Sequence, residues 1–75
     1  MLDQTKMLNV DSSNIKAIFF DKKKKELYVK FHGGRIYKYF KVDEVAYVDL
    51  HNAPSVGKHF AVNIKKQYDC EEYRG

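Results

Sequence analysis

Two segments with alternating side chains meet at a pair of adjacent glycines in the run ELYVKFHGGRIYKYF, residues 26–40. Because successive side chains of a strand point to opposite faces, this alternation predicts a β-hairpin, and Gly33-Gly34 can supply the positive φ angles of a tight primed turn. One face would carry Leu27, Val29, Phe31, Tyr37 and Tyr39. The other would carry Tyr28, Lys30, His32, Ile36, Lys38 and Phe40. We expect the first face to form a core and the second to meet a partner.

A further strand is predicted before this hairpin, over residues 14–20. Simple alternation places Ile15, Ala17 and Phe19 on one of its faces, and Lys16, Ile18 and Phe20 on the other. The next run, DKKKK at residues 21–25, is too charged for a core, so we expect it to form a solvated hairpin loop.

The hydrophobic period changes after Phe40 to spacings of three and four residues, which predicts a short helix over residues 42–53. Asp43 can cap its N-terminus, and Pro54 would end it. Ser55 can cap a second helix, whose apolar stripe comprises Val56, Phe60, Ile64 and Tyr68. Gly57 in its first turn indicates a close approach by another part of the chain. The sequence therefore predicts an α+β fold, a three-stranded antiparallel β-meander followed by two short helices packed on one face of the sheet.

One domain accounts for the whole chain. A chain of 75 residues buries only about 60% of its unfolded surface, but a hydrophobic content of 44% that includes six Tyr and five Phe supplies a core. We expect residues 1–9 to be a flexible lead-in, in which a short extra strand is an open alternative. Residues 10–69 would form the domain, and residues 70–75 a frayed tail.

The residues that could support catalysis do not form a recognisable set. His32, His51 and His59 fall on separate predicted elements, without a cysteine cluster or a carboxylate at a metal-binding spacing. Ser55 and His59 could touch on one helical face, but no orienting acid or oxyanion element accompanies them. We therefore expect a protein that is not an enzyme and has no catalytic, metal or cofactor site.

The mixed face of the sheet supports two interpretations. In the favoured one, Ile18, Phe20, Tyr28, Ile36 and Phe40 form an apolar patch that a homo-oligomer or another protein covers. In the alternative, aromatic rings stack on the bases of RNA or a nucleotide while lysines meet phosphates, which a net charge of +4 favours weakly. The candidate partner face comprises Lys16, Phe20, Tyr28, Lys30, Arg35, Lys38 and Phe40. The candidate core comprises Leu27, Val29, Phe31, Tyr37, Tyr39, Leu50, Phe60, Ile64 and Tyr68. For Tyr37 and Tyr39 we favour packing over a functional role, because a buried tyrosine commonly serves as core.

The order of these residues resembles the KTSC domain over roughly residues 10–68. In the first half the matching positions are Val10, Ser12-Ser13, Ile15, Ile18, Phe20-Asp21, Leu27, Val29, Phe31, Gly34 and the Tyr37-Lys38-Tyr39 triplet. In the second half they are Val42, Tyr47, Leu50, Ala53, Ser55, Gly57, Phe60, Asn63-Ile64 and Tyr68. Asp43 stands where the family usually has proline, and no role is assigned to Asn63.

This resemblance implies a module found at the C-terminus of some lysyl-tRNA synthetases and as stand-alone bacterial and phage proteins, for which RNA binding is the suggested role. We expect a small self-associating binding module for a protein or nucleotide ligand, with RNA or single-stranded nucleic-acid binding as the alternative. A single cysteine, Cys70, and the lack of a long apolar run predict a cytoplasmic protein with no membrane partner, in a bacterium or in the host of a phage.

Overall fold

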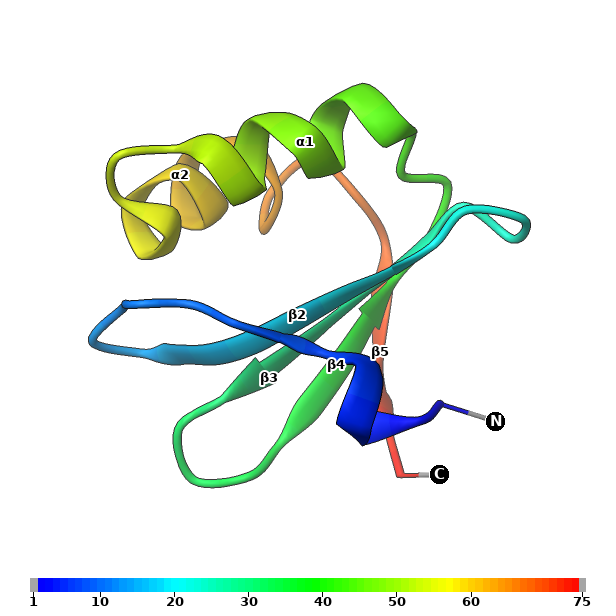
Figure 1. Ribbon diagram of the computed structural model, residues 1–75. Helices are drawn as coiled ribbons and strands as arrows, with labels where there is room; N and C mark the ends of the chain where they lie inside the picture. Colours follow the sequence, from blue (N-terminus) through cyan, green and yellow to red (C-terminus); the bar gives the residue numbers. More distant parts are fainter. Residues whose placement is uncertain (1, 75) are drawn as a thin grey trace.

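The computed structural model describes residues 2–74, which form one antiparallel sheet and a layer of two helices. The sheet has the strand order β1-β2-β3-β4-β5. Its strands are β1 (Leu8–Asn9), β2 (Ile15–Asp21), β3 (Glu26–Phe31), β4 (Ile36–Tyr39) and β5 (Cys70–Tyr73). A 3-10 turn, η1 (Gln4–Lys6), precedes β1, and the helices α1 (Glu44–Asn52) and α2 (Val56–Asn63) connect β4 to β5. Figure 1 shows both helices lying over the same side of the sheet.

The sheet has five strands, so the prediction of a three-stranded meander was right for the central strands and incomplete at both edges. Strand β1 pairs with β2, where Leu8 lies opposite Ile18; residues 1–9 were expected to be a flexible lead-in, and the short extra strand left open there is the outcome. Strand β5 pairs with β4, where Cys70 lies opposite Tyr39, although residues 70–75 were expected to fray. Strand β1 has only two residues and β5 is polar, and the order of β5 depends on β4, which is distant in sequence.

The central hairpin pairs Leu27 with Tyr39 and Val29 with Tyr37, which confirms that these four residues share a face. Its turn differs from the prediction. Gly34 N donates to the Phe31 carbonyl at 3.0 Å, which closes a turn centred on His32 and Gly33. Gly33 and Gly34 have φ angles of 104° and 101°, whereas His32 is not among the residues with positive φ. The turn is therefore not of a primed type, because both primed types need a positive φ at the first central residue.

A β-bulge at the start of β2 changes which side chains share a face. Ile15 lies opposite Phe31, but Ala17 lies opposite Lys30, so one extra residue is accommodated between the two pairs. Ile15 consequently joins Ile18 and Phe20 on the helix side. The prediction that placed Ile18 and Phe20 on the partner face was wrong, because one inserted residue reverses the alternation on one side of it.

The main core lies between the helices and the sheet. Its buried members are Ile15, Ile18, Leu27, Val29, Tyr39, Val42, Leu50, Val56, Phe60 and Ile64. The predicted caps are confirmed, since Asp43 Oδ1 accepts from Ala46 N at 2.8 Å and Ser55 Oγ accepts from Lys58 N at 3.4 Å. Tyr68 lies beyond the end of α2 but still packs on this core.

Gly57 confirms the expected close approach. A Cβ at this position would come within 2.6 Å of Asn14 Oδ1 and 2.7 Å of Ser12 Oγ. Ser12 Oγ in turn donates to Asn14 Oδ1 at 2.9 Å, so the turn that precedes β2 rests directly on the first turn of α2. Only glycine leaves room for this contact.

Candidate nucleic-acid interface

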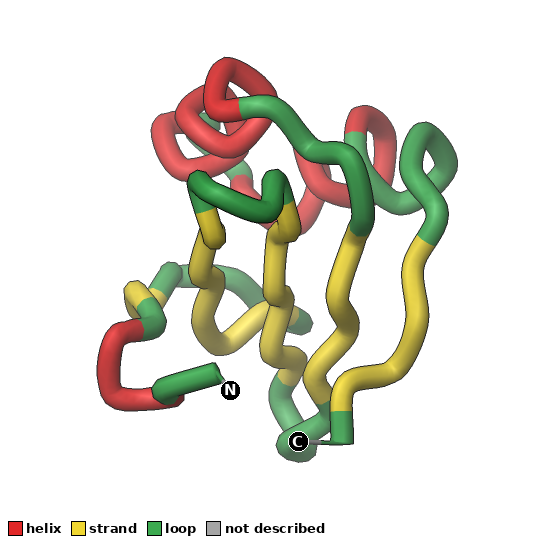
Figure 2. Tube along the Cα trace, turned by 90° about the vertical axis from the view of Figure 1, so that its right-hand side faces the viewer, coloured by secondary structure: helices red, strands yellow, loops and turns green. Residues whose placement is uncertain are grey.

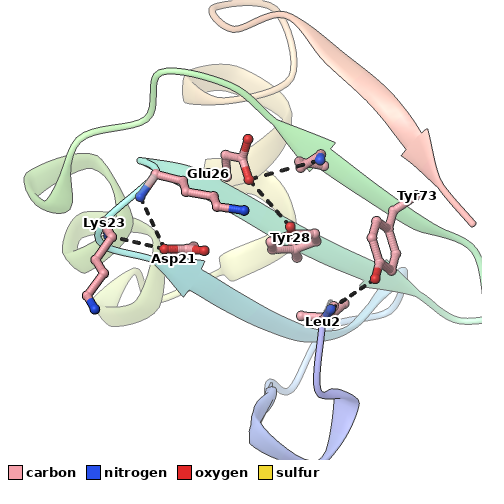
Figure 3. A network of polar contacts seen from close by, with 8 residues as sticks. Leu2, Asp21, Lys23, Glu26, Tyr28 and Tyr73 are labelled. Carbon is pink, nitrogen blue, oxygen red and sulfur yellow. Dashed lines mark hydrogen bonds and ion pairs between the residues drawn. The ribbon is translucent and has the colours of Figure 1, made fainter. Parts of the chain in front are cut away.

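The outer face of the sheet, on the side opposite the helices, carries a second small core. Met7, Ala17, Tyr28 and Ile36 are buried there, and Leu2, Phe19 and Tyr73 pack against them. The N-terminal segment, residues 2–9, packs against this face, and Leu2 N donates a hydrogen bond to the Tyr73 hydroxyl at 2.9 Å (Figure 3). Figure 2 shows both ends of the chain lying away from the helical layer. The exposed apolar patch on which the homo-oligomer expectation rested is therefore absent among the described residues.

Two of the three lysines expected to meet phosphates on the outer face are already engaged within the molecule. Lys38 Nζ lies 5.6 Å from the ring centre of Phe40 and 5.9 Å from that of Tyr28, and 4.0 Å from Glu26 Oε1. Lys30 Nζ donates to Gln4 Oε1 at 2.9 Å. A ligand on this face would have to replace these contacts, which a cation–π pair and a partly buried ion pair resist.

Burial also sets the ionisation of several tyrosines. Desolvation, followed by the nearby Glu26 carboxylate, raises the pKa of Tyr28 to about 12. Burial raises the pKa of Tyr47, and burial together with the neighbouring Cys70 thiol raises that of Tyr39. The neutral phenol is favoured in all three cases, as expected for core tyrosines rather than general bases.

The remaining candidate residues are spread over the molecule. Phe20 lies on the helix side and stacks on Tyr47, with ring centres 5.1 Å apart. Lys16 is exposed at the bulge, and Arg35 is exposed at the turn between β3 and β4. Of the candidate core residues, Phe31, Tyr37 and Tyr68 are half-buried and pack on the core, and Leu27, Val29, Tyr39, Leu50, Phe60 and Ile64 are buried. The structure thus does not bring the seven candidate partner residues together.

Exposed lysines gather instead at one end of the molecule, which we call the basic end. It comprises Lys22, Lys23, Lys24 and Lys25 in the loop between β2 and β3, and Lys41 between β4 and α1. Asp21 Oδ1 accepts from the backbone N–H groups of Lys23 and Lys24 at 3.1 Å each, which fixes the loop (Figure 3). Val42 N donates to the Lys25 carbonyl at 2.8 Å and so holds the Lys41 segment against it.

A hollow of about 450 Å³ opens beside this loop. It is lined by Lys24, Phe40, Lys41, Gln67, Tyr68 and Asp69. Phe40 N donates to the Asp69 carbonyl at 2.9 Å, which ties the end of β4 to the segment that follows α2. The hollow therefore combines two ammonium groups, two aromatic rings and hydrogen-bonding side chains. The sequence signalled only the lysine run, because residues 67–69 come to Phe40 through the fold.

Within residues 2–74, no three His, Cys, Asp or Glu side chains gather closely enough to hold a metal ion. No helix in the same range has the length and apolar character needed to cross a membrane.

Comparison with known proteins points to one family. The KTSC domain model matches residues 11–68. Lysine–tRNA ligases of Nostoc punctiforme and of a second Nostoc strain are each 38% identical over 66 residues, which is 88% of this chain. The chain spans only 12% of the length of either ligase. The crystal structure of a KTSC domain protein from Yersinia pestis has a TM-score of 0.85 at 30% identity, covering 91% of this chain and 96% of the other.

Proposed function

The chain belongs to the KTSC domain family, and on that premise we propose that it is a small, non-catalytic module that binds RNA through its basic end. The observation that carries the proposal is the hollow, where Lys24 and Lys41 flank the rings of Phe40 and Tyr68. Proteins that bind single-stranded nucleic acid combine positive charge along the backbone with aromatic rings that stack on bases.

The lysines of the basic end are largely available to a ligand. Lys22 forms an exposed ion pair with Glu44 at 3.6 Å, which is a weak contact. Within residues 2–74, Lys23, Lys24, Lys25 and Lys41 take part in none of the ion pairs. Their ammonium groups can therefore displace counterions from phosphates, which is the main source of affinity for nucleic acid.

Asp69 favours RNA over DNA as the ligand. Its carboxylate lines the same hollow, where it would repel phosphate but can accept a hydrogen bond from a ribose 2′-hydroxyl. The relatives add support, because a lysine–tRNA ligase by its name acts on an RNA, and a module of this size forms part of it.

Self-association and a protein partner stay predictions of lower weight. Their support was an exposed apolar patch on the outer face, and Ile18, Tyr28 and Ile36 of that patch are 0%, 7% and 5% exposed.

Fluorescence anisotropy with a labelled single-stranded RNA and a labelled tRNA tests the proposal. The double substitution Lys24→Glu with Lys41→Glu should weaken binding by about tenfold or more, because it removes two phosphate contacts and adds two like charges. The affinity of the unchanged protein should fall steeply with salt and should be lower for DNA of the same sequence.

The matched control is Lys16→Glu with Lys58→Glu. Both lysines are exposed, neither lines the hollow, and the net charge changes by the same amount. Equal weakening by the two double variants would show that only net charge matters and would refute a site at the basic end.

A further inference from the structure

A second cavity, of about 410 Å³, lies between α2 and the sheet. This volume falls within the range of roughly 300–1,000 Å³ typical of small-molecule sites. It shares no lining residue with the hollow at the basic end, so an inference about it does not rest on the proposed RNA binding. Its walls include four aromatic residues, Phe31, Tyr37, Tyr39 and Phe60, and its polar groups include Asn14 and Lys65.

The four aromatic rings are held in a chain of edge-to-face contacts. Phe31 meets Tyr37 with ring centres 5.8 Å apart at 80°, and meets Phe60 at 5.7 Å and 69°. Tyr39 meets Phe60 at 5.4 Å and 84°. Rings in edge-to-face contact can present both faces and edges to the cavity. This arrangement suits a planar aromatic ligand, which can stack on one ring and contact the edge of another. Tyr39 and Phe60 are nearly fully buried, so this wall is rigid.

The charge of the residues that line the cavity favours an anionic ligand over a cationic one. Lys65 is the one charged residue among the lining residues, and within residues 2–74 it takes part in no ion pair. No carboxylate lines the cavity to repel a negative group. Asn14 Oδ1 is occupied by Ser12 Oγ at 2.9 Å, and among the described residues its amide nitrogen has no acceptor, so it can donate to a ligand.

We propose that this cavity binds a free nucleoside monophosphate. The base lies against the half-buried rings of Phe31 and Tyr37, where stacking and edge contacts are both available. The phosphate lies beside Lys65, and the Asn14 amide donates to an acceptor on the base or the sugar. Each part of such a ligand then has a matching group, and no buried charge is left without a partner.

Amide NMR titrations with AMP, GMP, CMP and UMP test this proposal. At least one of the four should shift the signals of Phe31, Tyr37 and Ala61 to saturation. Its nucleoside and ribose 5-phosphate should each bind about tenfold more weakly, because each lacks one of the two anchored groups. If none of the four nucleotides gives saturable shifts at these residues at millimolar concentration, the proposal is wrong.

Lys65→Gln separates a phosphate contact from a general change in charge. It should weaken the nucleotide by about tenfold and leave the nucleoside unchanged, since only the nucleotide carries the anion. The control is Lys66→Gln, the next residue, which is exposed and does not line the cavity. Equal weakening by both variants would contradict the assignment of Lys65. A single-stranded RNA that shifts the cavity signals as strongly as the nucleotide would contradict a site for free nucleotides.

Discussion

Among single residues, Gly57 is a position where the fold leaves no room for a side chain. The Ser12 and Asn14 side chains occupy the space that a Cβ would need, at 2.7 and 2.6 Å. Gly57→Ala should therefore lower the free energy of unfolding by about 1–2 kcal/mol, although alanine favours a helix by about 1 kcal/mol. Urea unfolding followed by circular dichroism measures the change.

The same substitution should behave differently once the crowding atoms are removed. In a protein that already carries Ser12→Ala and Asn14→Ala, we expect Gly57→Ala to be neutral or stabilising, because only the helix propensity term remains. A stabilising effect of Gly57→Ala in the unchanged protein would show that the turn before β2 does not rest on α2 as described.

Tyr28 makes the stability of the protein depend on pH in the alkaline range. Burial raises its pKa from 10.0 to about 12, so the folded state keeps the phenol proton that the unfolded state has lost. Its contribution is fully present below pH 10 and disappears as the pH rises to about 12. Tyr28→Phe should lose less stability over this interval than the unchanged protein. The free energy of unfolding of both proteins can be measured by denaturant unfolding at several pH values. If it falls equally with pH in Tyr28→Phe and in the unchanged protein, the phenol of Tyr28 is not desolvated.

Among the elements, the N-terminal segment covers the apolar and aromatic side chains on the outer face of the sheet. Residues 2–9 contribute Leu2 and Met7 to the second core, which also contains Tyr28 and Ile36. A chain that begins at Val10 should be less stable and should self-associate, because the removal uncovers an apolar patch. Light scattering coupled to size exclusion gives the molar mass.

Single substitutions in the same segment provide the control. Met7→Asp places a charge in the second core and should reproduce the effect of the truncation. Leu8→Asp should change the mass little, because Leu8 is 46% exposed. A truncated chain with the mass and stability of the full chain would mean that the segment does not cover the face.

Some elements of this fold could be predicted from the sequence and others could not. The β3–β4 hairpin and both helix caps were predicted because each depends on residues that are neighbours along the chain. Strand β1 was only an open alternative, because its two residues form too short a pattern to predict a strand. The bulge at Ile15 and the edge strand β5 were missed, because each is defined by pairing with residues that are distant in sequence. The error in β2 moved Phe20 to the wrong face. The hollow at the basic end was missed for the same reason, since it joins Lys24, Phe40 and Tyr68 from three segments.

In the molecule as a whole, both sides of the sheet are used for packing, and five exposed lysines lie together at one end. The helices cover one side and the N-terminal segment the other. The two proposed ligand sites are the basic end and the cavity beneath α2. This arrangement explains why rings and lysines that alternate along the hairpin do not by themselves make a binding face.

RNA binding at the basic end is best tested by mapping the amide NMR shifts of the protein during an RNA titration. We expect shifts at residues 22–25, 40–41 and 67–69, and these shifts should weaken with added salt. Signals of Ala17, Tyr28 and Ile36 on the outer face should stay in place. Shifts confined to the outer face, or no saturable shift with any RNA at low salt, would show that the basic end does not bind RNA.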